Sequence, residues 1–399
     1  MRIAIYNDWW PPEVIGGAEK TASELSIHLA SVFGNSNIAV FTLSNSKVTI
    51  REIIDDISII RLGSQTFRSK YSIGTLIKIL EKMRIILGVS TRNVVIAEIL
   101  TFEPDLVILH NVDRLGINFA SHFKSISSVP IIRIQHDLGD TCIYRSRSRR
   151  VFKKNCVQTC TTCKIKESHF RSESKHYNEM ISVSEFLEST FHRLKFSALV
   201  STYGYPIATK FNFTSNHLYF NDKSAMRLGF IGRIVPEKGI EVVLHSMAQL
   251  KKMHSKKVSL TVCGTGSVRY LNKLRNLSRK LDVELTLLGA LKSPFDILAG
   301  KIDAVVVPST WQEPLGRVPM EAVSHGLPCF VSRIGGLPES KLFLRGPIVY
   351  FEPSNYIDLT EKLLFSLDNG IPISEATSND RNLNLIVERA CNTSQKNRN

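Results

Sequence analysis

Short apolar runs alternate with longer segments of helical periodicity along the whole 399-residue chain. Apolar runs bounded by polar residues predict buried parallel strands, whereas apolar residues three and four positions apart predict helices. In the first half the pattern predicts strands at residues 3–6, 37–42, 58–61, 106–110, 131–136 and 178–183, and helices at 18–32 and 75–87. Strands that alternate with helices in this way predict the α/β class with a doubly wound parallel sheet.

A second series of the same kind follows a segment, residues 195–223, in which Thr, Ser, Asn, Tyr and Pro cluster. This second series predicts strands at residues 227–231, 258–263, 284–288, 304–307 and 329–332, and helices at 240–253, 270–281 and 318–325. We therefore predict two Rossmann-like doubly wound domains facing a central cleft, over residues 1–205 and 206–375. Residues 376–399 are rich in Asn, Ser and Thr, and we expect them to form a partly disordered tail.

The length and charge of the chain narrow the classes of protein it can belong to. A chain of 399 residues accommodates two domains of roughly 150–200 residues each. It has no apolar run of the ~20 residues that a membrane span needs, and its first strand does not resemble a signal peptide, so we expect a cytoplasmic protein. The net charge of +15 favours anionic partners. Because no zinc-finger, RNA-recognition or basic-zipper motif is present, a peripheral position on an anionic membrane is favoured over nucleic acid.

Two carboxylates, Glu313 and Glu321, lie eight positions apart behind the apolar strand at residues 304–307. Glu313 is expected in the loop that leaves this strand, and Glu321 in the first turns of the next helix. Gly316, between them, allows backbone N–H groups such as those around Leu315 to approach a ligand closely. Ligands bind α/β sheets at this edge, and carboxylates there accept hydrogen bonds from paired sugar hydroxyls. The spacing therefore suits a sugar nucleotide.

Two cations, Arg233 and Lys238, follow the first strand of the second half. A diphosphate bound at the same sheet edge would need such charges, although a surface turn with incidental charges is the alternative. Gly16 and Gly17 precede the first helix, where their amides could bind an anion or simply form the turn into the helix.

Histidines end two strands of the first half. His136, followed by Asp137, ends one strand, and His110, followed by Asn111, ends the other. A histidine that is satisfied within the core is the usual situation, but the position at a strand's carboxyl end favours a contact with substrate, more strongly for His136 than for His110.

Four cysteines, Cys142, Cys156, Cys160 and Cys163, form a local group. Their proximity in a reducing compartment favours a structural zinc over disulfides, with four ordinary thiols as the alternative. Six of the ten residues from Arg145 to Lys154 are basic, which suits a solvated loop or a contact with a phosphate or lipid headgroup. The predicted helix at 75–87 could lie on a membrane or simply cover the sheet.

These motifs together resemble the retaining glycosyltransferases of family 4, which belong to glycosyltransferase group 1 and have the GT-B fold. The resemblance rests on Gly16–Glu19, His136–Asp137 with Cys142, Ser182–Phe186, Gly232–Arg233, Glu237–Gly239, Val307–Ser309, Glu313 with Glu321, Gly326–Pro328 and Gly335–Glu339. Three features depart from the family pattern, and the first is that the segment from Ser340 to Phe351 looks shortened. Arg317 stands where a small or apolar residue is usual, and the C-terminal helix that crosses back to the first domain is not evident.

The resemblance implies a role for each site residue. Arg233 and Lys238 would bind the donor diphosphate, Glu321 the ribose hydroxyls, and Glu313 the donor sugar. Backbone N–H groups around Leu315 and Gly316 would meet sugar and phosphate. Gly16 and Gly17 would approach the diphosphate from the first, acceptor-binding domain, and His136 would touch the donor sugar.

We interpret the chain as a retaining hexosyltransferase that moves a sugar from a nucleoside diphosphate to a hydroxyl of a saccharide or lipid-linked acceptor in surface glycan synthesis. No cofactor is expected for catalysis, because the two cations offset the charge of the leaving diphosphate. A sugar-nucleotide epimerase of the same fold and a non-catalytic subunit that binds sugar nucleotides are the alternatives.

Overall fold

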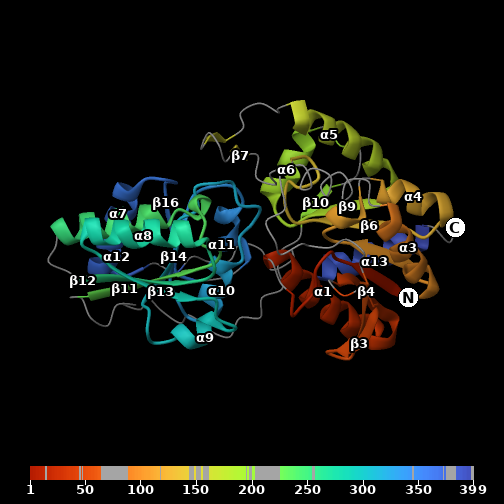
Figure 1. The fold of residues 1–399 in the computed structure, drawn as a ribbon, viewed down its shortest axis with the longest axis horizontal. Helices are drawn as coiled ribbons and strands as arrows, with labels where there is room; N and C mark the ends of the chain where they lie inside the picture. Colours follow the sequence, from red (N-terminus) through yellow and green to blue (C-terminus); the bar gives the residue numbers. More distant parts are fainter. Residues whose placement is uncertain are drawn as a thin grey trace. The chain divides into compact units, whose positions relative to one another are not determined.

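The protein forms two compact units, Met1–Pro206 together with Asp380–Asn399 (unit 1), and Ile207–Asn379 (unit 2). The first boundary lies one residue from the predicted one at 205/206. The computed structural model (Figure 1) describes residues 1–13, 16–44, 46, 48–63, 89–116, 118–142, 148–149, 154–155, 161–194, 196, 200–202, 225–253, 257–343, 346–371, 373 and 383–396.

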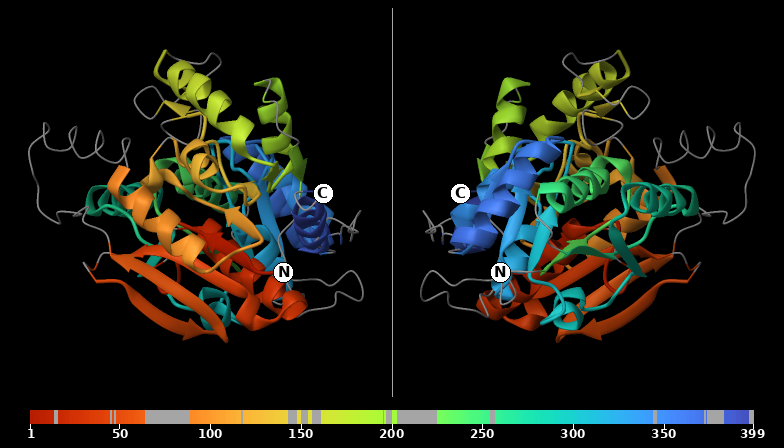
Figure 2. Two further views of the ribbon diagram at one scale, coloured as in Figure 1. Left: turned by 90° about the vertical axis from the view of Figure 1, so that its right-hand side faces the viewer. Right: turned by 90° about the vertical axis from the view of Figure 1, so that its left-hand side faces the viewer.

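Unit 1 contains an eight-stranded sheet in the order β10-β9-β6-β5-β1-β2-β4-β3. The strands are β1 (Ile3–Tyr6), β2 (Ile38–Ser44), β3 (Ile50–Ile54), β4 (Ile57–Gly63), β5 (Leu106–Leu109), β6 (Ile131–Gln135), β9 (Glu179–Ser182) and β10 (Val200–Thr202). All neighbouring pairs are parallel except β3 with β4, which is antiparallel. All six predicted strands are confirmed. β3, the outermost strand in Figure 2, and β10, inside the predicted linker, were not predicted.

Helices surround this sheet in the order that the predicted βα alternation requires. They are α1 (Gly17–Phe33), α3 (Val89–Thr101), α4 (Phe119–Ile126), α5 (Thr161–Glu173), α6 (Glu185–Arg193) and α13 (Leu383–Lys396), with 3-10 turns η1 (Asn35–Asn37), η2 (Asp113–Leu115) and η3 (Ser174–His176). A short antiparallel pair, β7 (Ser148–Arg149) and β8 (Lys154–Asn155), lies within the basic segment. The predicted helix at 75–87 and the rest of that basic segment lie outside the described residues.

The C-terminal segment corrects the prediction of a partly disordered tail over residues 376–399. Leu383–Lys396 forms the helix α13, which belongs to unit 1 and contacts α1 and β5 (Figure 1). Ile386 and Ala390 are completely buried, and Arg389 Nη1 lies 3.0 Å from Glu179 Oε1. The composition suggested disorder, but apolar residues four positions apart give the helix one buried face. This is the C-terminal helix returning to the first domain that was not evident in the sequence.

Unit 2 contains a six-stranded, wholly parallel sheet in the order β13-β12-β11-β14-β15-β16. The strands are β11 (Ala225–Ile231), β12 (Lys257–Cys263), β13 (Glu284–Gly289), β14 (Ala304–Val307), β15 (Cys329–Ser332) and β16 (Ile348–Phe351). The first five confirm the prediction, whereas β16 was missed. The strand order reverses between β11 and β14, and doubly wound sheets bind their ligands beyond the carboxyl ends of such a pair.

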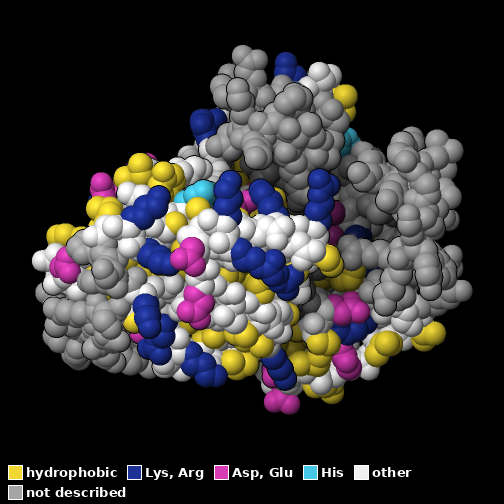
Figure 3. All heavy atoms as spheres, turned by 60° about the vertical axis from the view of Figure 1, so that its left-hand side comes forward, with side chains coloured by type: hydrophobic (Ala, Val, Ile, Leu, Met, Phe, Trp, Pro, Cys, Tyr) yellow, Lys and Arg dark blue, Asp and Glu magenta, His cyan; other side chains and the backbone are white. Residues whose placement is uncertain are grey.

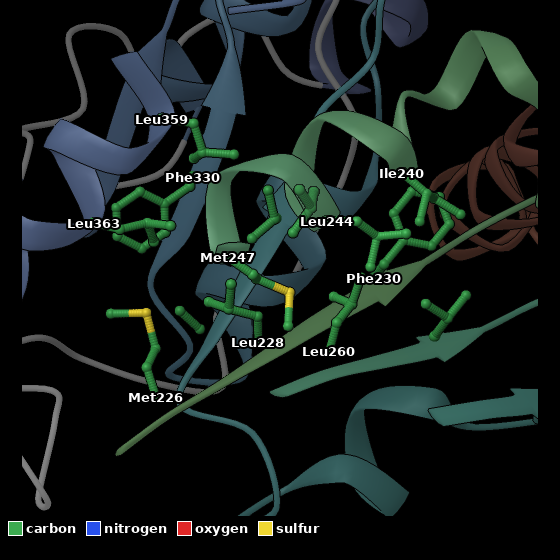
Figure 4. Packing of buried hydrophobic residues seen from close by; sticks show 14 of the residues in the cluster. Met226, Leu228, Phe230, Ile240, Leu244, Met247, Leu260, Phe330, Leu359 and Leu363 are labelled. Atoms are coloured by element: carbon green, nitrogen blue, oxygen red, sulfur yellow. The ribbon is translucent and has the colours of Figure 1, made fainter. Parts of the chain in front are cut away.

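The helices of unit 2 bury apolar side chains against both faces of this sheet. They are η4 (Pro236–Lys238), α7 (Ile240–Met253), α8 (Val268–Leu281), α9 (Pro294–Leu298), α10 (Val318–Ser324), η5 (Leu337–Glu339), α11 (Ser340–Phe343) and α12 (Tyr356–Asn369). In Figure 4, Leu228 of β11 and Phe330 of β15 pack with Leu244 of α7 and Leu363 of α12. Each such side chain stabilises the fold by roughly 1.5–3 kcal/mol when fully buried. The loops of the sheet edge therefore start from rigid strands.

On the face of the molecule shown in Figure 3, the described basic side chains lie in scattered positions. Figure 3 shows Lys and Arg side chains distributed over one face among apolar and polar ones, without a single continuous block. Within the part of the chain that the structure describes, no helix has the length and apolar character needed to cross a bilayer.

Candidate functional site

The loops that follow β11 and β14 are locked together at the switch point of the second sheet. Gly239 has φ +70°, and a Cβ atom there would lie 1.9 Å from the carbonyl oxygen of Pro308. The backbone N–H of Thr310 donates to the carbonyl of Glu237 over 2.9 Å. Only glycine permits this approach, and the approach brings Lys238 of one loop to Glu313 of the other. Two residues predicted from separate motifs therefore share one site.

The carboxylate of Glu313 is buried, and three donors converge on one of its oxygens. Ser309 Oγ donates to Oε1 over 2.6 Å, Trp311 Nε1 donates over 3.1 Å, and the ammonium of Lys238 makes a short contact with the same atom. The Lys238 ammonium also lies 5.7 Å from the centroid of the Trp311 ring, within reach of a cation–π contact. None of the residues that the structure describes donates to Oε2 of Glu313. The sequence did not reveal this asymmetry.

The backbone on either side of Glu313 is equally constrained. The N–H of Gly336 donates to the Glu313 carbonyl over 2.8 Å, and a Cβ atom on Gly335 would lie 2.4 Å from that oxygen. Gly316 has φ +84°, and a Cβ atom there would meet Leu337 at 2.5 Å. The glycine between the two glutamates is therefore required by backbone conformation and packing, and its predicted contact with a ligand remains a prediction.

Glu321 lies in the first turn of α10, as the spacing predicted. Arg317 Nε donates to Glu321 Oε1 over 3.1 Å, and the two side chains are only 7% and 17% exposed. The residue that departs from the family pattern is thus an ion-pair partner of one of the two predicted glutamates. A basic residue four positions before an acidic residue on a helix is a signal that could have shown this pair.

Arg233 differs from Lys238 in its surroundings. Its side chain is exposed and makes no hydrogen bond or ion pair with any residue within the described ranges. Its loop is held against the loop after β12, because a Cβ atom on Gly264 would lie 1.8 Å from the Gly232 carbonyl oxygen. A guanidinium on a fixed loop, with no partner in the described part of the chain, is suited to bind an anionic ligand.

In unit 1, the two histidines that end neighbouring strands form one pair. His110 Nδ1 lies 2.7 Å from His136 Nε2, and the rings are stacked with centroids 5.0 Å apart. Burial lowers the pKa of His110 well below its ordinary value, and the charges of His136 and Arg133 lower it further. His110 is therefore neutral at neutral pH, and the 2.7 Å contact requires one ring to donate to the other. The two predicted candidates, His136 and His110, therefore contact each other directly.

Charged residues close to this pair in the sequence make contacts that the sequence analysis did not predict. Arg133 of β6 lies in the core and donates to both carboxylate oxygens of Asp140 at 3.0 Å. Burial raises the pKa of Asp137 to about 6, although its Oδ1 accepts from the backbone N–H of Gly139 over 2.6 Å. An arginine between isoleucines of a predicted buried strand was the available signal for a buried ion pair.

The paired glycines before α1 form part of a capping box. The N–H of Gly16 donates to Glu19 Oε2 over 2.8 Å, and Gly17 is the first residue of the helix. The Glu19 carboxylate thus accepts the hydrogen bond of the Gly16 amide in this structure. The role predicted for Gly16 and Gly17 in binding an anion remains a prediction.

The cysteine group is only partly described. Cys142 and Cys163 are buried, whereas Cys156 and Cys160 lie outside the described residues. Among the residues with described placement, no group of three or more His, Cys, Asp or Glu side chains could hold a metal ion. The predicted structural zinc therefore remains a prediction.

Solved structures of glycosyltransferases with the GT-B fold resemble the whole chain. Sucrose-phosphate synthase from Thermosynechococcus elongatus matches with TM-score 0.68 and 16% identity, covering 99% of this chain and 94% of that chain. Anabaena HepE in complex with UDP-glucose matches with TM-score 0.60 and 16% identity, covering 100% and 98%. The predicted fold is confirmed.

The family follows from comparisons of sequence. Residues 219–375 match the family model of the Glycosyl transferases group 1. An uncharacterized 42.6 kDa protein in the cps region of Klebsiella pneumoniae is 28% identical over 285 residues, which cover 68% of this chain and 70% of that protein. The expected resemblance to group 1 is confirmed, and family 4 within it remains a prediction.

Proposed function

We propose that the protein is a retaining glycosyltransferase that transfers a sugar, of hexose type, from a nucleoside diphosphate to a hydroxyl acceptor. The observation that carries this proposal is the cluster at the switch point of unit 2. There, the buried carboxylate of Glu313 has one oxygen that accepts from no described donor, and it lies beside Lys238. The loop of Lys238 also carries Arg233, which has no partner among the described residues. The UDP-glucose held by HepE, which has the same fold, supports a sugar nucleotide as the donor.

Each part of the donor has residues that suit its chemistry. Arg233 and Lys238 bind the diphosphate, and backbone N–H groups around Leu315 and Gly316 assist them. Glu321 accepts hydrogen bonds from the ribose hydroxyls. Glu313 accepts one from the sugar through Oε2.

Retention follows from a front-side reaction in this proposal. The bond between the anomeric carbon and the acceptor oxygen forms on the face from which the bond to the diphosphate oxygen breaks. The acceptor proton passes to the leaving phosphate oxygen, and the cations offset the charge that develops there. The ammonium of Lys238 and the two further donors on Oε1 draw charge from the whole Glu313 carboxylate and lower its nucleophilicity, so the proposal assigns Glu313 to sugar binding and not to covalent attack. The mechanism uses no cofactor.

The roles in unit 1 and the acceptor are further parts of the proposal. His136 contacts a sugar ligand, and the amides of Gly16 and Gly17 meet an anionic one. The acceptor is a saccharide or a lipid-linked saccharide in surface glycan synthesis, in line with the cps-region relative. Such an acceptor suits a cytoplasmic protein that associates peripherally with the inner face of an anionic membrane.

A ligand screen and a product analysis test this function. Thermal shift with UDP-glucose, GDP-mannose and ADP-glucose, each beside its nucleoside diphosphate, identifies the donor by the largest rise in melting temperature. NMR of the first product with a glycan acceptor then reports the anomer. A retained anomer supports the proposal. An epimerised nucleotide sugar without transfer would identify the epimerase, and binding without turnover would identify a non-catalytic subunit.

A further inference from the structure

The three donors on Oε1 of Glu313 come from side chains that surround it on two loops. Ser309 is completely buried and directly follows Pro308 at the end of β14, whereas Trp311 is two residues before Glu313. Lys238 reaches the same oxygen from the loop after β11. A carboxylate can otherwise rotate and exchange its oxygens, so three convergent donors select one orientation.

We propose that Ser309 and Trp311 are positioning residues that hold Glu313 in a single orientation, so that Oε2 is the only oxygen presented to the transferred sugar. This proposal rests on the function proposed above and assigns the discrimination of sugar hydroxyls to these two side chains. Neither residue needs to touch the donor itself.

Trp311 has a second contact that Ser309 lacks. Its indole N–H donates to Glu313, and its ring faces the ammonium of Lys238 at 5.7 Å from the ring centroid. Because the indole nitrogen is a donor only, it cannot exchange roles with the carboxylate. One side chain thus orients both the sugar-binding carboxylate and the diphosphate-binding cation.

Separate substitutions distinguish the two contacts of Trp311. Trp311→Phe removes the N–H and keeps an aromatic face for Lys238, whereas Trp311→Leu removes both. Ser309→Ala removes only the second donor to Glu313. A buried hydroxyl far from the site supplies the matched control, Ser366→Ala on α12, where Ser366 donates to the Lys362 carbonyl over 2.7 Å.

The experiment measures, by calorimetry, the Kd of the sugar nucleotide selected from UDP-glucose, GDP-mannose and ADP-glucose, and the Kd of its nucleoside diphosphate. The ratio of the two constants reports the sugar contact alone. We expect Ser309→Ala and Trp311→Phe each to raise the ratio of the sugar-nucleotide Kd to the diphosphate Kd about tenfold and to lower kcat about tenfold, since a hydrogen bond to a charged group is involved. The diphosphate affinity itself should stay within about twofold. Trp311→Leu should weaken the diphosphate as well, and Ser366→Ala should change neither constant.

Two results would overturn the proposal in different ways. If Ser309→Ala and Trp311→Phe weaken the sugar nucleotide and the diphosphate equally, the residues only support the loop, and the positioning role is wrong while the transferase function stands. If the unmodified protein binds none of the three sugar nucleotides, the proposed function fails, and the positioning role fails with it.

Discussion

Replacing Lys238 by methionine should destabilise unit 2, because the substitution leaves a buried carboxylate without its cation. The Lys238 and Glu313 side chains are 20% and 6% exposed. Removing one partner of a fully buried ion pair costs about 3–5 kcal/mol. Ser309 and Trp311 still donate to Glu313, and Lys238 retains some contact with solvent, so we expect the smaller value of about 2 kcal/mol. In a domain of this size, the melting temperature should fall by roughly 4–8 °C.

Differential scanning calorimetry and urea unfolding measure this effect, and two further variants test its cause. Lys251→Met is the matched control, because the ion pair of Lys251 with Asp282 is exposed and should contribute little. The double variant Lys238→Met with Glu313→Gln should lose less stability than the sum of its single variants, since the orphaned charge is gone. If Lys238→Met melts at the same temperature as the control, the pair does not hold the two loops and the reasoning is refuted.

The remaining predictions concern ligand affinity, turnover, pH and metal. Arg233→Ala should weaken nucleoside diphosphate binding about tenfold in calorimetry with an unchanged melting temperature, since its exposed guanidinium has no partner among the described residues. Glu313→Gln should lower kcat with nucleotide affinity nearly kept, whereas Glu321→Gln should mainly raise the donor Kd; steady-state kinetics with the reverse division would contradict the assigned roles. Folding raises the pKa of Asp137 to about 6, so its stabilising contribution is complete below pH ~4 and is lost as the pH rises through 6. Asp137→Asn should therefore be more stable than the unmodified protein at pH 7–8, by at most ~3 kcal/mol, and equal to it near pH 4 in urea unfolding. If the cysteine group binds zinc, metal analysis should find about one zinc per chain, and chelation should lower the melting temperature; protein purified without chelator that holds none would exclude it.

The fold was predictable where burial is continuous along a strand. The strands β1, β14 and β15 have every residue buried, so their apolar runs stand out in the sequence. β3 was missed because most of its residues are exposed at the edge of the sheet, and it therefore has no apolar run. α13 was missed for a different reason, since two buried residues on one face are hidden in a polar composition.

The position of the site was predictable from the sequence, but the contacts between its side chains were not. Strand ends and glycines placed Lys238 and Glu313 at one sheet edge, because parallel strands present their carboxyl ends together. Their ion pair depends on the close approach at Gly239, which no spacing reveals. The contacts from Ser309 and Trp311 depend on the backbone conformation of a loop, for which hydrophobic periodicity carries no information.

The return of the chain to unit 1 through α13 has a consequence for the order in which the protein can fold. The ribosome completes all of unit 2 before it synthesises Leu383–Lys396, the segment that covers α1 and β5. Unit 2 is continuous in sequence and can complete its hydrophobic core first. Part of the apolar surface of unit 1 stays exposed until α13 has been synthesised. A fragment of residues 1–206 should therefore need residues 383–396, supplied through a linker, to reach its native packing.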